Sequence, residues 1–265
     1  MMDFTFKTYR ELHSTFLANG YRYVRVDQFT PDLYAEKVVV LRHDVDRIPY
    51  RSYQTAMIEH ELGIAGTYYF RIVKESFHIP IIKDITALGH EIGYHYEDLA
   101  LANGDMQLAI KTFEQHLRMF EDLFPVTTAV MHGSPLSKHD NRLMWQKFNY
   151  KSFGITTEPY FDIDFTRLLY LTDTGRVWNG KTGNVRDREM KSTSEPLSAK
   201  YNFNSTIDVM NAIKKKEIAN CIMLNFHPER WTDNVVDWCK IYLVQKIKNP
   251  VKKLLQIRAK AMLND

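Results

Sequence analysis

The sequence is poor in cysteine and lacks any long apolar segment. Only two cysteines, Cys221 and Cys239, occur in 265 residues, and their spacing is not that of a metal-binding or redox-active pair. Such sparse use of cysteine suits a reducing compartment. No apolar run approaches the ~20 residues that a membrane-spanning helix needs. The first residues also lack a basic region followed by an apolar run, so we expect no secretion signal and a cytoplasmic protein.

A strong charge of either sign is also missing, and so is any linker between domains. The formal net charge is only +3, which predicts no general affinity for nucleic acid or other polyanions. No internal repeat, low-complexity tract or segment rich in proline and glycine divides the sequence. We therefore expect a single domain over residues 1–265, in which residues 232–265 form a basic, helical C-terminal extension.

What the sequence does contain is a regular alternation of strand-like and helix-like segments. Helices are expected at residues 5–19, 50–62, 79–88 and 105–123, and strands at residues 37–43, 66–71, 91–96, 126–131 and 222–226. This alternation favours an α/β fold with a parallel sheet, and its repetition along the chain favours a closed or nearly closed barrel. Residues 155–200 are less regular and are expected to supply loops over one end of the barrel.

The first strong strand ends in two carboxylates. Four apolar residues, 38–41, are followed by Arg42, His43, Asp44, Val45 and Asp46. In extended backbone Asp44 and Asp46 project on the same side. Like charges that close cost free energy unless a cation or a shared proton relieves them. The alternative interpretation is that these acids cap the next helix or pair with Arg47.

Polar residues of similar chemistry end three further strands. His95 and Glu97 follow one strand, His132 follows the next, and His227 follows the last. In a parallel α/β barrel, function collects at the carboxyl ends of the strands. A single histidine in such a place is more often structural, but its recurrence on several strands favours a shared site.

These residue types fit a metal-assisted hydrolysis. A divalent ion held by carboxylate and imidazole polarises a carbonyl group and lowers the pKa of bound water toward ~7. A neighbouring aspartate can accept the proton of that water, and a histidine can donate one to the leaving group. Mixed nitrogen and oxygen ligands without cysteine suit zinc, and also manganese, cobalt or iron.

The order of these motifs resembles that of the polysaccharide deacetylases, the NodB-homology or carbohydrate esterase 4 group. The resemblance covers roughly residues 36 to 231. The residues that carry it are the strand-end aspartates, the segments Gly89-His90-Glu91-Ile92-Gly93-Tyr94-His95 and Leu224-Asn225-Phe226-His227-Pro228, and a His/Pro loop between them. The resemblance implies a distorted (β/α)7-type barrel. It also implies the removal of acetyl groups from N- or O-acetylated sugars with one divalent metal, commonly zinc.

Carried over residue by residue, the resemblance assigns a general base, two metal ligands and a general acid. Asp44 matches the general base and Asp46 a metal ligand, although the two are separated here by Val45, so that the reverse assignment also stays open. His95 matches a further metal ligand. His227 matches the general acid that protonates the leaving amine.

The remaining positions depart from the pattern of the family. Leu99 stands where the family has its second histidine ligand, so that Glu97, or alternatively His132, is expected to complete the metal site. The family lines its substrate groove with an arginine and a proline. His132 and Pro135 occupy that segment here and are expected to contact substrate.

Two residues of a polar loop are further candidates for substrate binding. Trp178 could stack on a sugar ring, and Arg176 could bind a carboxylate or phosphate. The alternative for Trp178 is that it anchors the loop to the protein.

The basic C-terminal extension and the expected compartment bear on the choice of substrate. Lysines and arginines of the extension alternate with Leu254, Leu255, Ile257 and Leu263. The segment therefore either packs on the barrel or touches an anionic membrane at its periphery. A cytoplasmic deacetylase would act on a nucleotide-linked or lipid-linked precursor of a surface glycan. The competing hypothesis is a catalytically silent barrel that binds a glycan or a partner protein.

Overall fold

The computed structural model describes residues 2–121, 123–133, 137–178 and 195–247. Seven parallel strands form one sheet. They are β1 (Arg22–Val24), β2 (Val38–Val45), β3 (Thr67–Phe70), β4 (Glu91–Tyr96), β5 (Ala129–Met131), β6 (Leu169–Thr172) and β7 (Cys221–Phe226). Their order is β5-β4-β3-β2-β7-β6, and β1 pairs with the first half of β2. Because every pairing is parallel, all carboxyl ends lie at one edge of the sheet.

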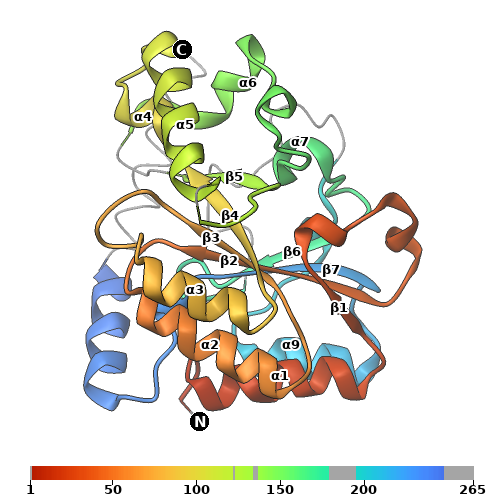
Figure 1. Ribbon diagram of the computed structural model, residues 1–265. Coiled ribbons are helices and arrows are strands. Elements are labelled where there is room, and N and C mark those ends of the chain that lie inside the picture. Colours follow the sequence, from red (N-terminus) through yellow and green to blue (C-terminus); the bar gives the residue numbers. More distant parts are fainter. Residues whose placement is uncertain (1, 122, 134–136, 179–194, 248–265) are drawn as a thin grey trace, which may run out of the picture.

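Helices connect the strands and cover the sheet. They are α1 (Phe6–Ala18), α2 (Pro49–Glu61), α3 (Ile79–Ala87), α4 (Asp98–Leu101), α5 (Met106–Glu121), α6 (Met144–Lys147), α7 (Pro159–Asp162) and α9 (Thr206–Lys215), and residues 235–247 are also helical. In Figure 1, α9, α1, α2 and α3 lie side by side beneath the sheet, whereas α4 to α7 lie on its upper side. The sheet curls between these groups into a half-barrel.

The alternation of side chains along β2 decides which residues meet at the site. Val38 and Val40 belong to one apolar cluster, whereas Val39 and Leu41 belong to the cluster on the other face of the sheet. Period two then places Arg42 and Asp44 on the face of Val38 and Val40. The face of Val39 and Leu41 receives His43.

His43 lies in a buried polar network under the sheet. Its Nε2 atom is 2.8 Å from the carboxylate of Glu59, and its Nδ1 atom is 3.2 Å from the carbonyl oxygen of Thr67. His90, which ends the turn after α3, accepts a hydrogen bond from the backbone of Gly66. These two histidines therefore fix the packing of α2 and the neighbouring turn against the sheet, and they do not face Asp44.

The parallel α/β organisation predicted from the sequence is confirmed, and the closest agreement is at β4, where the bounds are identical to those expected. The sheet is a curled half-barrel, which is compatible with a distorted barrel. Strands β1 and β6 and helix α9 were not expected. In the part of the chain that the structure describes, no helix combines the length and the apolar character needed to cross a membrane.

Candidate metal centre

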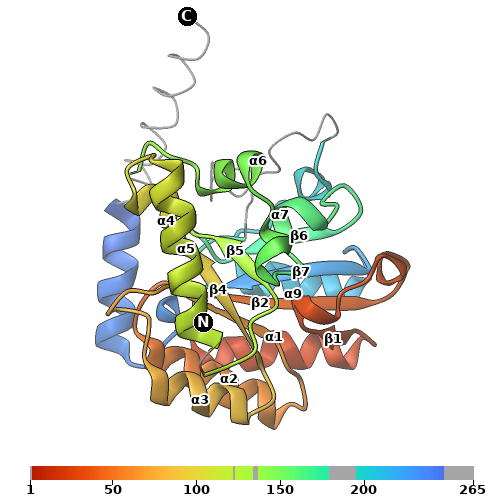
Figure 2. The same ribbon diagram turned by 45° about the horizontal axis from the view of Figure 1, so that its top comes forward.

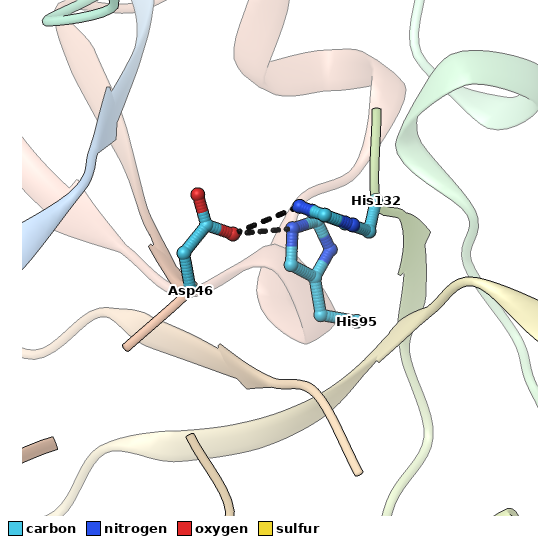
Figure 3. A group of neighbouring side chains, drawn as sticks. All are labelled: Asp46, His95 and His132. Carbon is cyan, nitrogen blue, oxygen red and sulfur yellow. Dashed lines mark ion pairs between the residues drawn. The ribbon is translucent and has the colours of Figure 1, made fainter. Parts of the chain in front are cut away.

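Three side chains from the carboxyl ends of β2, β4 and β5 converge on one point (Figure 3). Asp46 Oδ1 lies 3.3 Å from His132 Nε2 and 3.6 Å from His95 Nε2. Asp46 follows β2, His95 is in β4, and His132 follows β5, and β4 pairs with β5. One ligand atom from each residue lies within 4.8 Å of the others. This triad could therefore hold a metal ion.

Hydrogen bonds on the far side of each imidazole ring prepare the two histidines as ligands. His95 Nδ1 lies 3.1 Å from the carbonyl oxygen of Val130, and His132 Nδ1 lies 2.9 Å from Glu97 Oε2. Since both partners only accept hydrogen bonds, each Nδ1 atom must carry the proton. In the neutral ring the lone pair is then on Nε2, the atom that faces Asp46. Hydrogen bonds of this kind orient metal-ligating histidines and raise their basicity.

The carboxylate of Asp46 is the electrostatic centre of the triad. Its Oδ1 atom is buried and has no hydrogen-bond partner among the described residues. Burial alone would raise the pKa of this carboxyl group, but the facing rings of His132 and His95 hold the pKa well below its usual value. A buried, ionised oxygen that points toward two imidazole nitrogens is the arrangement that a divalent cation satisfies best.

Glu97 orients His132 and does not belong to the triad. Its carboxylate accepts a hydrogen bond from Arg71 Nε at 2.8 Å and another from His132 Nδ1. The expectation that Glu97 supplies the third ligand assumed that β4 stays extended through this residue. Instead β4 ends at Tyr96, and Glu97 is the N-cap of α4 with ψ of 24°. The change of backbone direction turns the carboxylate toward Arg71, and the alternative candidate, His132, takes the third position.

Replacing Glu97 by glutamine is expected to weaken zinc binding by about 10- to 100-fold without abolishing it. The amide cannot hold the Nδ1 proton of His132 as strongly as a carboxylate does. Titration calorimetry with a competing chelator measures the change. Glu114→Gln is a matched control, because Glu114 pairs with Arg118 on the surface of α5. Complete loss of binding in Glu97→Gln would instead identify this carboxylate as a ligand.

Asp44 lies beside the triad and is held by a buried arginine. Arg42 Nε and Nη2 donate to the two carboxylate oxygens of Asp44, both at 2.8 Å, and Asn225 donates a third hydrogen bond at 3.0 Å. Burial opposes ionisation of Asp44, but the charges of Arg42 and His95 lower its pKa well below the usual range. Asp44 Oδ2 lies 3.9 Å from His95 Nε2. An ionised carboxylate is thus fixed next to the position of the ion.

His227 is held by Asp173, a buried residue at the end of β6. Asp173 Oδ1 lies 2.7 Å from His227 Nδ1, and Asp173 Oδ2 accepts the backbone N–H of His227 at 2.9 Å. Arg230 and the indole of Trp231 also donate to this carboxylate. Burial and Arg230 lower the pKa of His227, but the charge and hydrogen bond of Asp173 outweigh them and raise it. His227 also interacts electrostatically with Asp46.

Glu229 adds a buried acid on the same side. Its side chain is almost fully buried, and Oε2 has no hydrogen-bond partner among the described residues. Burial and the nearby charge of Asp46 raise the pKa of Glu229 to about 7. Glu229 is therefore partly protonated at neutral pH.

Arg176 and Trp178 lie in the protein interior. Trp178 is only 1% exposed, packs against Phe4, Phe226 and Trp231, and donates its indole N–H to Thr206. Its ring faces are covered by protein, as in the alternative interpretation that Trp178 anchors the loop. Arg176 donates to the carbonyl oxygen of Asp3 and lies over the ring of Trp238. Pro135, the other residue expected to line the groove, lies outside the described residues.

Three residues that hold the site in place were not among the candidates. Arg42 and Arg71 bind the carboxylates of Asp44 and Glu97, and Asp173 binds His227. Arg42 carried a usable signal, because it is two positions before Asp44 in the same strand. Asp173 directly follows Thr172, the last residue of the four-residue strand β6, and so short a strand gives only a weak sequence signal.

Comparisons of this chain with protein-family models, with curated proteins and with solved structures find no match. The site is therefore interpreted from its own geometry. It contains a triad that could hold a metal ion, an ionised aspartate beside that triad, and a histidine whose tautomer is fixed by a buried aspartate.

Proposed function

We propose that the protein is a metal-dependent hydrolase that removes an acetyl group from an N- or O-acetylated sugar. The observation that carries this proposal is the orientation of the two imidazole rings of the triad toward the carboxylate of Asp46. Both histidines direct Nε2 toward Oδ1 of Asp46, an ionised, buried oxygen for which the described part of the chain offers no hydrogen-bond partner. Three protein ligands that leave a fourth position open are typical of catalytic zinc. The curled parallel sheet also fits a distorted (β/α)7-type barrel of the polysaccharide deacetylase kind.

Zinc bound by Asp46, His95 and His132 would act as a Lewis acid on the acetyl carbonyl and would lower the pKa of a bound water. Asp44 is ionised and adjacent, so it can accept the proton of the attacking water. Arg42 stabilises this negative charge and keeps Asp44 from adopting another rotamer. The pairing weakens Asp44 as a base, but it leaves the carboxylate available at every pH near neutrality.

His227 is suited to donate a proton to the leaving group. Asp173 fixes the proton on Nδ1 and raises the pKa of the ring. The raised pKa increases the share of the imidazolium form near neutral pH, and in that form the Nε2 proton is the one available for transfer. The proton can go to the departing sugar nitrogen or oxygen as its bond to the acetyl carbon breaks.

We propose a nucleotide-linked or lipid-linked N-acetylated sugar, a precursor of a surface glycan, as the substrate. A panel of such sugars should be assayed for acetate release by the metal-free protein and by the protein reloaded with zinc. We expect release only with metal, and only from some members of the panel. Zinc bound at one ion per chain without acetate release from any member would favour the silent, glycan-binding barrel.

The affinity for zinc should increase with pH. In the metal-free protein burial lowers the pKa of His132, but the facing carboxylates of Asp46 and Glu97 outweigh burial and raise the pKa to about 9. Because a metal binds the neutral ring, binding must displace this proton. The affinity should rise about tenfold per pH unit between pH ~6.5 and ~8.5 and should level off above the pKa.

The stability of the metal-free protein should change in the opposite direction. A pKa raised on folding stabilises the folded state below the unfolded pKa near 6.5, and this stabilisation is lost as the pH rises through about 9. The increase in melting temperature caused by zinc should therefore grow with pH. Glu97→Gln serves as the control. Loss of the Glu97 carboxylate should lower the pKa of His132, so the zinc affinity and the zinc-induced increase in melting temperature should both level off at lower pH. An affinity that is independent of pH would contradict the assignment of His132 as a ligand.

A further inference from the structure

The last helix that the structure describes, residues 235–247, exposes its apolar side chains. Val236, Leu243 and Ile247 are 62%, 60% and 70% exposed. The helix stands at the side of the molecule in both ribbon views (Figures 1 and 2). In most amphipathic helices of globular proteins the apolar stripe faces the core. Here that stripe faces water, so it is available to a partner.

Contacts on the opposite side of this helix prevent it from rolling inward. The indole N–H of Trp238 donates to the carbonyl oxygen of Asp3 at 2.6 Å, and Asp237 forms a 2.8 Å ion pair with Arg51. At about 100° per residue, Val236, Leu243 and Ile247 lie on the side of the helix away from Trp238. The polar and aromatic anchors therefore fix the outward direction of the apolar stripe.

The charge of the chain from this helix onward has one sign. Between Asp237 and Asp265 the sequence has seven lysines and arginines and no acidic residue. They are Lys240, Lys246, Lys248, Lys252, Lys253, Arg258 and Lys260. Since the whole chain is only +3, the remainder of the protein is net negative. Attraction to a polyanion is thus confined to the end of the chain that also exposes the apolar stripe.

We propose that the helix of residues 235–247 docks on the surface of an anionic lipid membrane through its apolar stripe and its exposed lysines, Lys240 and Lys246. Insertion of an apolar helix face at the interface and attraction of lysines to anionic headgroups each give weak binding, and the two together give stable binding. Lys240 lies on the same side of the helix as Val236 and Leu243, so it would meet the headgroups as the stripe enters the interface.

Charge also disfavours the other occupants of this face. Two copies of the protein that met through the stripe would bring two segments of high positive charge together, which costs electrostatic free energy. A return of residues 248–265 onto the stripe would bury Leu254, Leu255 and Ile257, but it would give no reason for the run of positive charges, without an acidic residue, between Asp237 and Asp265.

Co-sedimentation with lipid vesicles tests the proposal on the full chain. We expect binding to vesicles of phosphatidylcholine with about 30% phosphatidylserine, little binding to pure phosphatidylcholine, and release at high salt. Leu243→Glu combined with Ile247→Glu should weaken binding by about tenfold or more. Lys240→Gln combined with Lys246→Gln should weaken it by about thirtyfold, which corresponds to about 1 kcal/mol for each lysine near the surface.

The matched control is Leu108→Glu with Met119→Glu. These residues of α5 are 50% and 44% exposed, so the control adds the same charge to a different helix. It should bind vesicles like the wild type. All variants should release acetate from a water-soluble substrate at the wild-type rate, which keeps this proposal separate from that of the function.

Four results would overturn the proposal. The first is wild-type protein that stays in the supernatant with anionic vesicles, and the second is equal loss of binding in the α5 control. The third is a dimer that Leu243→Glu with Ile247→Glu dissociates in the absence of lipid, which would make a second copy the occupant. Strong protection of both residues 235–247 and 252–263 from hydrogen exchange without lipid, with no change when vesicles are added, would likewise favour the folded-back segment.

Discussion

Replacing His95 by alanine is expected to reduce zinc from about one ion per chain to less than about a tenth and to lower acetate release by ~10³-fold or more. The reason is geometric. His95 Nε2 faces both Asp46 and Asp44, and its Nδ1 proton is already held by the carbonyl oxygen of Val130. Alanine leaves one imidazole and one carboxylate, and two ligands hold zinc weakly. Elemental analysis after dialysis measures the metal, and an acetate assay measures the activity.

His60→Ala is the matched control for this experiment. His60 is exposed at the end of α2 and touches the carbonyl oxygen of Leu88. It should keep full metal content and activity. The melting temperatures of the metal-free wild type and His95→Ala should be compared as well, so that loss of metal is separated from loss of fold. A His95→Ala protein that retains one tightly bound zinc would exclude the triad as the metal site.

The site could be predicted from the sequence wherever a regular strand continues to the carboxyl edge of the sheet. The apolar run of β2 and its alternation placed Asp44 on one face and His43 on the other, and the structure has that arrangement. The same reasoning could not choose between Glu97 and His132. The choice depends on where β4 ends and α4 begins. Because the backbone changes direction at Glu97, this carboxylate turns away from Asp46, and His132 faces Asp46 instead.

Residues that depend on distant partners were beyond prediction from local patterns. Trp178 sits in a polar, glycine-containing segment, which resembles an exposed loop in the sequence. Its burial comes from Phe4 and Trp231, which lie far from it along the chain. Asp173 was missed for a related reason, since β6 has only four residues and lies at the end of the strand order. Short edge strands carry too few residues for a periodic pattern to stand out.

Replacing His227 by alanine is expected to lower the rate of deacetylation of an N-acetylated sugar by ~10²- to 10⁴-fold while the zinc content stays at one ion per chain. His227 is not part of the triad, and its ring is held by Asp173 rather than by a metal ligand. The loss should therefore lie in the chemical step. Single-turnover rates and elemental analysis on the same protein sample measure the two quantities together.

The leaving group decides whether this loss reflects proton donation. An amide nitrogen must be protonated as it departs, whereas an activated phenolic acetate leaves without a proton. His227→Ala should therefore lose little activity on the phenolic ester and most of its activity on the amide, whereas His95→Ala should lose both. Equal losses on the two substrates would assign His227 to binding or positioning. The contrast works because Asp173, at the end of β6, holds the ring of His227, whereas the three residues of the triad lie at the ends of β2, β4 and β5.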